Sequence, residues 1–491
     1  MKEITIIGGG LSGLAASCYL AKSNFKVKII DKNETMGGRL SSFEIDGFKF
    51  DYGPSWYWMP DVFEDFFNEF DKEVSDYYDL KRLNPSYKFF FEKSNHIIPS
   101  KFSNIKKEYE KIENNSSIKL DEFINRGEKK YKISMNGFID LPNLSFREYF
   151  SIDVLKYFFS LDFFISLRKH IKKYFSNTKI IQMLEFPSMF LGGTPSNTPG
   201  LYSLMNYADL KGGTWYPMGG MIEVTKAFTN LSLELGVEHI NNIEIKKLMI
   251  DNSSIVEAKS SIGKNFKSDF FLCCAEYPFV QNNLIEKKYR TYSRNYWSKR
   301  KVAPSALIFY LGLSEKIKNF EHHNLFFDND FDKHLDEIFV QKKWPEDPLF
   351  YVCCPSKTDS STVPSPKHEN LFILVPIGSG SLDEEKIRNI YFKKILRRIE
   401  SKVKQKIEDK IIFKKSFCVN DFKNRYNAYN GNAYGLANTL FQTAIFKPKM
   451  KDAKIKNLYY SGHFTVPGPG LPPAIISGKI ASKQIIKDAQ I

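Results

Sequence analysis

Residues 3–31 read EITIIGGGLSGLAASCYLAKSNFKVKIID, and this stretch decides the fold. Residues 3–7 are predicted to form a short buried strand, and the glycines of a complete G-x-G-x-x-G pattern, Gly8, Gly10 and Gly13, follow directly. Residues 14–22 have helical composition, and residues 27–30 form a second β-branched strand that ends in Asp31. Strand, glycine turn, helix, second strand and terminal acid in this order predict a dinucleotide-binding βαβ unit.

Each part of this unit has a physical role. Gly8 permits the tight turn, Gly10 allows the backbone to approach a pyrophosphate, and Gly13 lets helix and strand pack closely. The helix amino terminus, with Leu11 and Ser12 in its first turn, offers N–H groups and a positive dipole to phosphates. Asp31, with Lys32 beside it, is placed to accept hydrogen bonds from a ribose. The alternative is a tight strand-to-helix turn that binds nothing.

The next two motifs distinguish between nucleotide cofactors. Residues 36–39 read MGGR and residues 48–58 read FKFDYGPSWYW. Gly38 and Arg39 bring backbone and a cation to cofactor phosphates, and in the DYGPS run Gly53 can approach a flat ring, Pro54 stiffens the turn and Ser55 follows. These motifs resemble the flavin amine oxidase and phytoene desaturase superfamily, which implies FAD, and plain NAD dehydrogenases do not carry them.

The carboxy-terminal segment carries the most specific resemblance. Residues 457–478 read NLYYSGHFTVPGPGLPPAIISG: a short strand, a rigid Pro/Gly loop and the start of a helix with proline in its first turn. Read alone, it could be a turn without a ligand. It resembles the carboxy-terminal flavin motif of bacterial-type phytoene desaturases. The resemblance implies that Gly462 and His463 lie near the pyrophosphate and ribityl chain, although wider FAD families often have an acid where His463 stands. It also implies that the isoalloxazine lies near Gly470, Leu471 and Pro472.

The resemblance covers nearly the whole chain and implies its organisation. We expect an α/β fold: an FAD-binding Rossmann-like (two-dinucleotide-binding) domain with a discontinuous mixed α+β substrate domain and a helical membrane-facing region. The FAD-binding domain is expected at residues 1–70, 213–282 and 416–491, and the substrate domain at residues 71–212 and 283–415. The backbone of Ile245 matches the adenine contact of the family, and residues 215–217 resemble the segment that faces the flavin and the substrate entrance.

Residues 145–190 mix apolar rings with Arg168, Lys169, Lys172 and Lys173. Such a mixture suits helices at a membrane interface, with rings in the acyl boundary and cations at the headgroups. The alternative is a set of helices packed on the core with a solvated basic face. No apolar run reaches the roughly 18–20 residues needed to span a bilayer. The chain begins almost at once with a strand and leaves no room for a signal peptide, so we expect a cytoplasmic, peripherally membrane-associated protein.

Composition excludes several classes of function. The net charge of +15 comes without a nucleic-acid-binding motif, so no nucleic-acid partner is expected. The six cysteines form no Cys-x-x-Cys pair, and we interpret them as buried thiols of a reducing compartment. His322 and His323 are adjacent, but no third ligand with sensible spacing stands nearby in the sequence, so no metal is expected.

The expected activity follows from the family resemblance. It implies FAD-dependent desaturation of phytoene, a lipophilic polyene, to a conjugated carotene such as lycopene, with a quinone or oxygen as electron acceptor. A later-step desaturase, an isomerase or a ketolase are close alternatives. A soluble amine oxidase and a non-catalytic lipid carrier are more distant ones. Asp51, Tyr52, Tyr216 and Tyr434 fall in segments near the flavin, but the sequence assigns a catalytic role to none of them.

Overall fold

The computed structural model describes residues 1–145 and 162–490. A five-stranded parallel sheet has the order β19-β13-β1-β2-β9, with β1 at its centre. Its strands come from three separated parts of the chain: β1 (Glu3–Ile7), β2 (Lys26–Ile30), β9 (Glu238–Ile240), β13 (Phe270–Cys273) and β19 (Leu458–Tyr460). These parts lie in the three segments that the sequence grouped into one nucleotide-binding domain.

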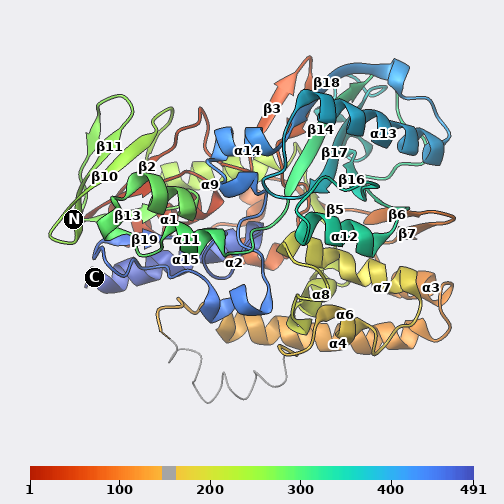
Figure 1. Ribbon diagram of the computed structural model, residues 1–491, viewed down its shortest axis with the longest axis horizontal. Coiled ribbons are helices and arrows are strands. Elements are labelled where there is room, and N and C mark those ends of the chain that lie inside the picture. The colour runs from red at the N-terminus through yellow and green to blue at the C-terminus, as the bar shows by residue number, and fades with distance from the viewer. Residues whose placement is uncertain (146–161, 491) are drawn as a thin grey trace.

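Helices flank this sheet and bring the two ends of the chain together (Figure 1). Helix α1 (Leu11–Lys22) packs against the carboxy-terminal helix α15 (Leu471–Asp488) and also against α9 (Ile222–Glu234). A Cβ atom on Gly478 would lie 2.6 Å from the carbonyl oxygen of Ser12, so only glycine allows this close approach of α15 to α1. A three-stranded antiparallel sheet lies at the outer edge: β10 (Ile245–Asp251), β11 (Ser254–Ser260) and β12 (Asn265–Phe266).

The second half of the molecule is built on a seven-stranded mixed sheet of order β18-β14-β17-β16-β15-β6-β7. All its pairings are antiparallel except β15 with β6. The strands are apolar on both faces because helices cover the sheet, α13 (Glu385–Val403) among them (Figure 1). Their bounds are β6 (Tyr87–Phe91), β7 (Asn95–Ile98), β14 (Ser305–Leu313), β15 (His323–Phe327), β16 (Phe350–Cys353), β17 (Glu369–Ile377) and β18 (Ile411–Phe417).

A layer of helices lies on the side of this sheet opposite α13 (Figure 1). It contains α3 (Phe102–Glu110), α4 (Ser116–Ile133), α6 (Leu167–Ile171), α7 (Thr178–Glu185) and α8 (Leu204–Leu210), with α12 (Phe331–Phe339) between this layer and the sheet. The remaining elements connect the two halves: β3 (Ser42–Ile45), β4 (Phe48–Asp51), α2 (Pro60–Asn68), β5 (Leu80–Arg82), β8 (Trp215–Pro217), α10 (Tyr277–Phe279), α11 (Arg294–Ser298) and α14 (Val419–Tyr426). The mixed α/β architecture agrees with the expected fold class.

The described part of residues 145–190 packs much of its apolar surface inward. Leu167, Ile171 and Leu184 are fully buried, whereas the ring of Phe164 is 68% exposed. Arg168 pairs with the buried carboxylate of Glu185 at 2.6 Å, so this cation serves an internal ion pair. Residues 146–161 of the predicted membrane-contact region lie outside the described residues. No helix in the two described ranges is both long enough and apolar enough to cross a bilayer.

Candidate active site

One cavity runs from the glycine turn of the first sheet to the helical layer under the second sheet. Seventeen of the residues proposed from the sequence to contact the cofactor line it: Gly8, Gly10, Leu11, Ser12, Asp31, Lys32, Gly38, Arg39, Gly53, Pro54, Ser55, Ile245, Gly462, His463, Gly470, Leu471 and Pro472. Gly13 is the exception, because it packs behind the turn, where a Cβ atom would lie 2.2 Å from the carbonyl oxygen of Gly8. The fold therefore gathers residues from both ends of the chain around one space.

The glycine turn has the geometry of a phosphate cradle. Gly8 has a φ of +106°, a backbone conformation that residues other than glycine rarely adopt. Gly10 has no atom within 4 Å of the position that a Cβ would take, and it faces the cavity. The carboxylate of Asp31 accepts a hydrogen bond of 2.7 Å from the N–H of Gly9, so it also holds the turn in place. The backbone is thus open where a diphosphate needs close approach.

A buried ionic cluster lies beside this turn. The carboxylate of Glu276 contacts Arg39 Nη2 at 3.2 Å and His463 Nε2 at 3.0 Å, and it accepts a hydrogen bond from Asn432 Nδ2 at 2.6 Å. Burial alone would raise the pKa of Glu276, but the neighbouring His463 and Arg39 more than offset it and hold the pKa at about 2. Glu276 therefore stays ionised while fully buried.

Sequence reasoning missed Glu276, although it follows strand β13 directly, and the carboxyl ends of parallel strands border the binding crevice in such sheets. Wider FAD families often have an acid at the position of His463. In this protein the acid is Glu276, which contacts His463. The Nε atom of Arg39 is buried and has no hydrogen-bond partner among the residues that the structure describes. An unsatisfied guanidinium donor beside an open glycine turn fits an anionic diphosphate.

The carboxy-terminal loop closes the same space. Gly462 and Gly470 have φ values of +110° and +122°, and the N–H of Gly462 donates to Ser477 Oγ at 2.9 Å. Helix α15 begins at Leu471, with Pro472 in its first turn, and its amino terminus borders the cavity. A second helix amino terminus is thereby brought to the nucleotide site, as expected from the sequence.

Beyond the nucleotide end, the cavity becomes apolar. Aromatic and aliphatic side chains from the loop after β4, from residues 186–191 and from strands β15 and β16 surround it. They include Trp56, Trp58, Phe186, Phe190, Leu325, Phe327, Leu349 and Phe350. Such a lining suits a hydrocarbon chain and offers little to a charged substrate.

The four polar residues considered from the sequence separate into two pairs. Tyr52 and Tyr434 line the cavity. Asp51 instead accepts hydrogen bonds from the backbone N–H groups of Met221 and Ile222 at the start of α9. Tyr216 is buried in strand β8, which pairs with β5, and residues 215–217 do not line the cavity.

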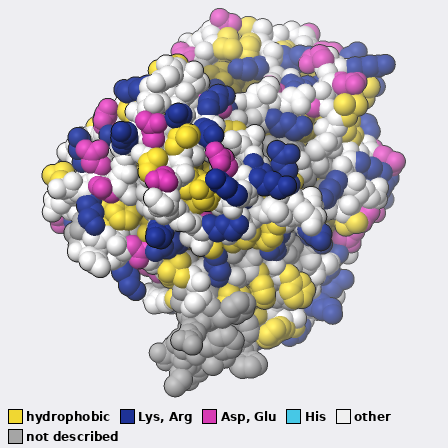
Figure 2. Space-filling view, turned by 60° about the vertical axis from the view of Figure 1, so that its left-hand side comes forward, with side chains coloured by type: hydrophobic (Ala, Val, Ile, Leu, Met, Phe, Trp, Pro, Cys, Tyr) yellow, Lys and Arg dark blue, Asp and Glu magenta, His cyan; other side chains and the backbone are white. Residues whose placement is uncertain are grey.

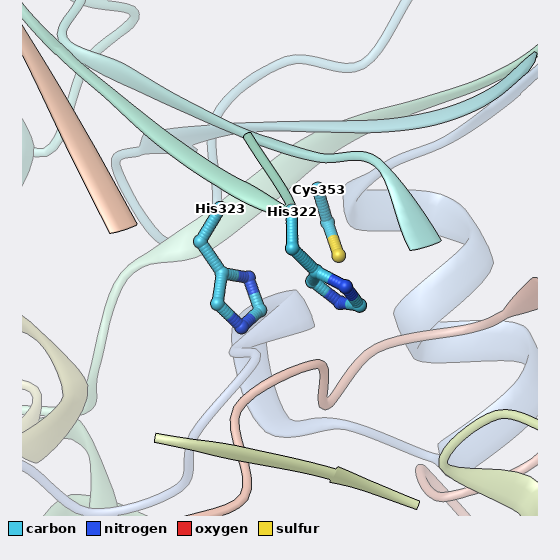
Figure 3. Close-up of side chains that lie close together, drawn as sticks. All are labelled: His322, His323 and Cys353. Carbon is cyan, nitrogen blue, oxygen red and sulfur yellow. The ribbon is translucent and has the colours of Figure 1, made fainter. Parts of the chain in front are cut away.

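His322 and His323 lie close to Cys353 (Figure 3), and His323 is stacked on Trp56, which lines the apolar part of the cavity. Strand pairing puts His323 opposite Cys353, and one ligand atom from each of His322, His323 and Cys353 lies within 4.8 Å of the other two. Cys353 was not recognised from the sequence as a potential third ligand because 30 positions separate it from His323. Nδ1 of His322 is hydrogen-bonded to Thr358 Oγ1 at 2.8 Å, and Nδ1 of His323 to the Tyr351 hydroxyl at 2.7 Å. Burial raises the pKa of the Cys353 thiol to about 12.

Comparisons with known proteins agree with this site. A family model described as flavin containing amine oxidoreductase matches residues 11–486. A carotenoid 3,4-desaturase from Haloarcula japonica is 37% identical over 99% of this chain and 98% of its own length. A zeta-carotene-forming phytoene desaturase from Myxococcus xanthus is 28% identical over 99% of this chain and 94% of its own. The structure of a putrescine oxidase bound to putrescine covers 99% of both chains with a TM-score of 0.63 at 12% identity, a likeness of fold.

The chain therefore belongs to the flavin-containing amine oxidoreductase family, and the two relatives named above are carotenoid desaturases. It is an oxidoreductase whose cofactor is FAD. The open turn at Gly10 and the unsatisfied Arg39 Nε fit the diphosphate of this cofactor. These findings confirm the resemblance read from the glycine turn and the carboxy-terminal motif.

Proposed function

We propose that this protein desaturates a carotenoid polyene, with phytoene as the leading substrate and a conjugated carotene such as lycopene as the product. The observation that carries the proposal is the continuity of the cavity: the cofactor-lining residues Gly53 and Gly470 and the apolar residues Phe190 and Phe327 border one space. A bound flavin supplies an acceptor for a hydride. The protein aligns an allylic C–H bond with that acceptor and keeps water away from the chain.

A later-step desaturation of an already conjugated carotene is the second candidate. It is supported by the 37% identity to the carotenoid 3,4-desaturase, against 28% to the phytoene desaturase. The experiment is to incubate the flavin-loaded protein with liposomes that contain either phytoene or lycopene and to identify products by absorbance and mass. New double bonds in phytoene support the first candidate, and new double bonds in lycopene alone support the second. Failure with both substrates contradicts desaturation.

We also propose that the protein takes its substrate directly from a membrane surface. Burial of a methylene is worth about 0.8 kcal/mol, so a chain of about 40 carbons costs on the order of 30 kcal/mol to hold in water. Phe441 is 72% exposed and Phe446 is 44% exposed, and their rings lie 6.2 Å apart between centroids. Figure 2 shows hydrophobic side chains gathered at the lower end of one face, with Lys and Arg side chains above them. Aromatic rings next to Lys and Arg side chains are typical of protein surfaces that bind at the boundary between lipid headgroups and acyl chains.

The membrane proposal is tested by sedimentation with liposomes that contain anionic lipid. The double variant Phe441→Ser/Phe446→Ser is expected to bind these liposomes more weakly than the unmodified protein. Ile262→Ser is the matched control because Ile262 is also well exposed but stands in the turn between β11 and β12. Equal loss of binding in both variants would contradict a specific docking surface. A quinone or oxygen is proposed as electron acceptor, to be tested by reoxidation of the reduced protein with each.

A further inference from the structure

Desaturation leaves a proton that the protein has to accept. Two C–H bonds on adjacent carbons break and one C=C bond forms: one hydrogen leaves with its electron pair, for which FAD supplies the acceptor, and the other leaves as a proton. Among the described residues that line the cavity, the carboxylates are Asp31, Glu244 and Glu276. Asp31 holds the glycine turn, Glu276 holds the Arg39 cluster, and Glu244 directly precedes Ile245 of β10, so all three stand at the nucleotide end. The apolar half of the cavity therefore needs another proton acceptor.

We propose that Tyr351 and His323 form this acceptor, an inference that rests on the proposed desaturase function. Ser55 and Tyr351 both line the cavity, and the hydroxyl of Tyr351 lies 2.9 Å from Ser55 Oγ. The same hydroxyl lies 2.7 Å from Nδ1 of His323, which is fully buried. A continuous hydrogen-bonded path thus leads from Ser55, through the hydroxyl of the cavity-lining Tyr351, to the fully buried imidazole of His323.

The surroundings of His323 suit a ring that gains a proton for part of the cycle. The indole of Trp56 is stacked on the imidazole, with centroids 4.1 Å apart and planes inclined by 11°. The face of a tryptophan ring attracts a cation, so this stack stabilises the imidazolium. Burial and the neighbouring His322 hold the pKa of His323 well below its ordinary value, so the ring is neutral before reaction and an imidazolium formed there returns its proton readily. Its Nε2 has no hydrogen-bond partner in the described ranges.

The proton passes from the polyene to the protein in one coupled transfer. As the hydride leaves, positive charge develops on the polyene and makes the adjacent C–H bond acidic, so a weak base is sufficient. The oxygen of Tyr351 accepts that proton while its own proton moves to Nδ1 of His323. Tyr351 ends with its hydroxyl restored, and His323 ends as an imidazolium. When the product has left and water enters the cavity, the proton returns by the same two atoms to solvent.

A metal site is the competing interpretation of the same cluster, since His322, His323 and Cys353 each offer a ligand atom (Figure 3). One observation favours the relay: Nδ1 of each histidine is already engaged by a hydroxyl. Metal ligation requires a thiolate, whereas a relay needs only the hydroxyl and the imidazole that are already in contact.

The test compares Tyr351→Phe and His323→Gln with the unmodified holoenzyme in anaerobic single turnover with polyene liposomes. Tyr351→Phe is expected to slow flavin reduction about 100-fold, a typical contribution of general base catalysis, with little change in half-saturating substrate. The rate of the unmodified protein is expected to fall in D2O, and this solvent isotope effect should disappear in the variant. Tyr57→Phe is the matched control, because Tyr57 is a buried tyrosine paired with Tyr78 that does not line the cavity.

Three readouts separate the possible outcomes. Flavin content and the nitrogen-15 signals of the histidines are measured without turnover: only the His323 Nδ1 signal should shift in Tyr351→Phe. If Tyr351→Phe does not retain flavin, His323→Gln tests the same path from its far end. Unchanged reduction rates in these variants overturn the relay, as does a stoichiometric metal in the purified protein that is lost in His323→Gln. An unmodified protein that desaturates no polyene overturns the proposed function instead.

Discussion

The Nε2 atom of His463, from the carboxy-terminal loop, lies 3.0 Å from the carboxylate of Glu276, which stands shortly after strand β13 in the middle of the chain. Arg39, from the amino-terminal segment, contacts the same carboxylate at 3.2 Å. Three distant parts of the sequence are therefore joined by one buried negative charge. This carboxylate holds Arg39 and His463 side by side, and all three residues line the cavity.

Replacement of Glu276 by glutamine is expected to weaken both the fold and cofactor retention. The change leaves Arg39 without its charged partner, and breaking a buried ion pair typically costs about 3–5 kcal/mol. Urea unfolding of the variant should show a loss of about 3 kcal/mol, with faster release of flavin on dilution. Glu44→Gln is the control because Glu44 is exposed on β3. A variant as stable as this control would contradict the structural role of Glu276.

Gly10→Ala is expected to weaken cofactor binding while preserving the fold. The φ of Gly10 is −70°, which alanine adopts without strain, and no atom lies near the new Cβ. The methyl group would occupy the space where the diphosphate approaches, so we expect flavin affinity to fall by about 10-fold or more, the equivalent of about 1.4 kcal/mol. Flavin absorbance and thermal unfolding measure the two effects. Gly137→Ala, another open glycine, is the control, and equal flavin content in both would contradict the prediction.

Asp209→Asn is expected to flatten the dependence of stability on pH. Asp209 is fully buried between Tyr87 and Thr214, and burial raises its pKa to about 7. Between about pH 4 and pH 7 the native state holds a proton that the unfolded state has released, so the free energy of unfolding falls as pH rises through this window. The slope from one such group is about 1.4 kcal/mol per pH unit. The variant should lose this part of the slope.

Urea unfolding at pH 5 and pH 7 measures the difference. Asp51, whose pKa burial also raises to about 7, contributes a similar slope that stays in the variant. Asp46→Asn, at an exposed turn, is the control and should keep the full slope. An Asp209→Asn protein with the pH profile of this control would show that Asp209 is ionised in the folded state at acidic pH.

Lys447→Met is expected to stabilise the protein near neutral pH. Lys447 is buried, its Nζ has no hydrogen-bond partner within the described part of the chain, and burial lowers its pKa to about 7. In the unfolded state the amine of Lys447 stays protonated up to about pH 10.5, whereas in the native state it loses its proton above about pH 7. The free energy of unfolding therefore falls as pH falls from about 10.5 to about 7. Removing the amine removes this penalty, about 1.4 kcal/mol for each unit of pKa shift.

Thermal unfolding at pH 7.5 and pH 9.5 checks this result. The advantage of Lys447→Met should be larger at pH 7.5 than at pH 9.5, because the penalty on the lysine declines as pH rises. Lys299→Met, on an exposed lysine, should show no comparable gain. A destabilised Lys447→Met protein would indicate that the amine makes a necessary contact in solution.

The nucleotide end of the site could be predicted from the sequence because its determinants are local. Gly8, Gly10 and Asp31 act through a turn of fixed geometry, and the order of strand, glycine and helix specifies where that turn lies. The loop at Gly462 and Gly470 was predicted by resemblance, since sequence alone does not say that it returns to the first strand. Both segments border one cavity in the structure.

The contacts that depend on strand register could not be predicted. Tyr351 meets His323 because β15 and β16 pair antiparallel with His323 opposite Cys353, and no periodicity in either strand encodes this register. Glu276 follows β13, which pairs with β1 in parallel, and it contacts Arg39 from a distant part of the chain. Trp215 and Tyr216 stand in β8, which pairs with β5, and they are not among the residues that line the cavity.

The last strand of the five-stranded sheet, β19, and the helix that closes the cofactor cavity, α15, both come from the final 40 residues of the chain. Strand β19 pairs with β13 and helix α15 packs on α1, so this segment closes the cavity only where those partners are folded. Retention of the flavin is therefore expected to depend on the docking of this one segment.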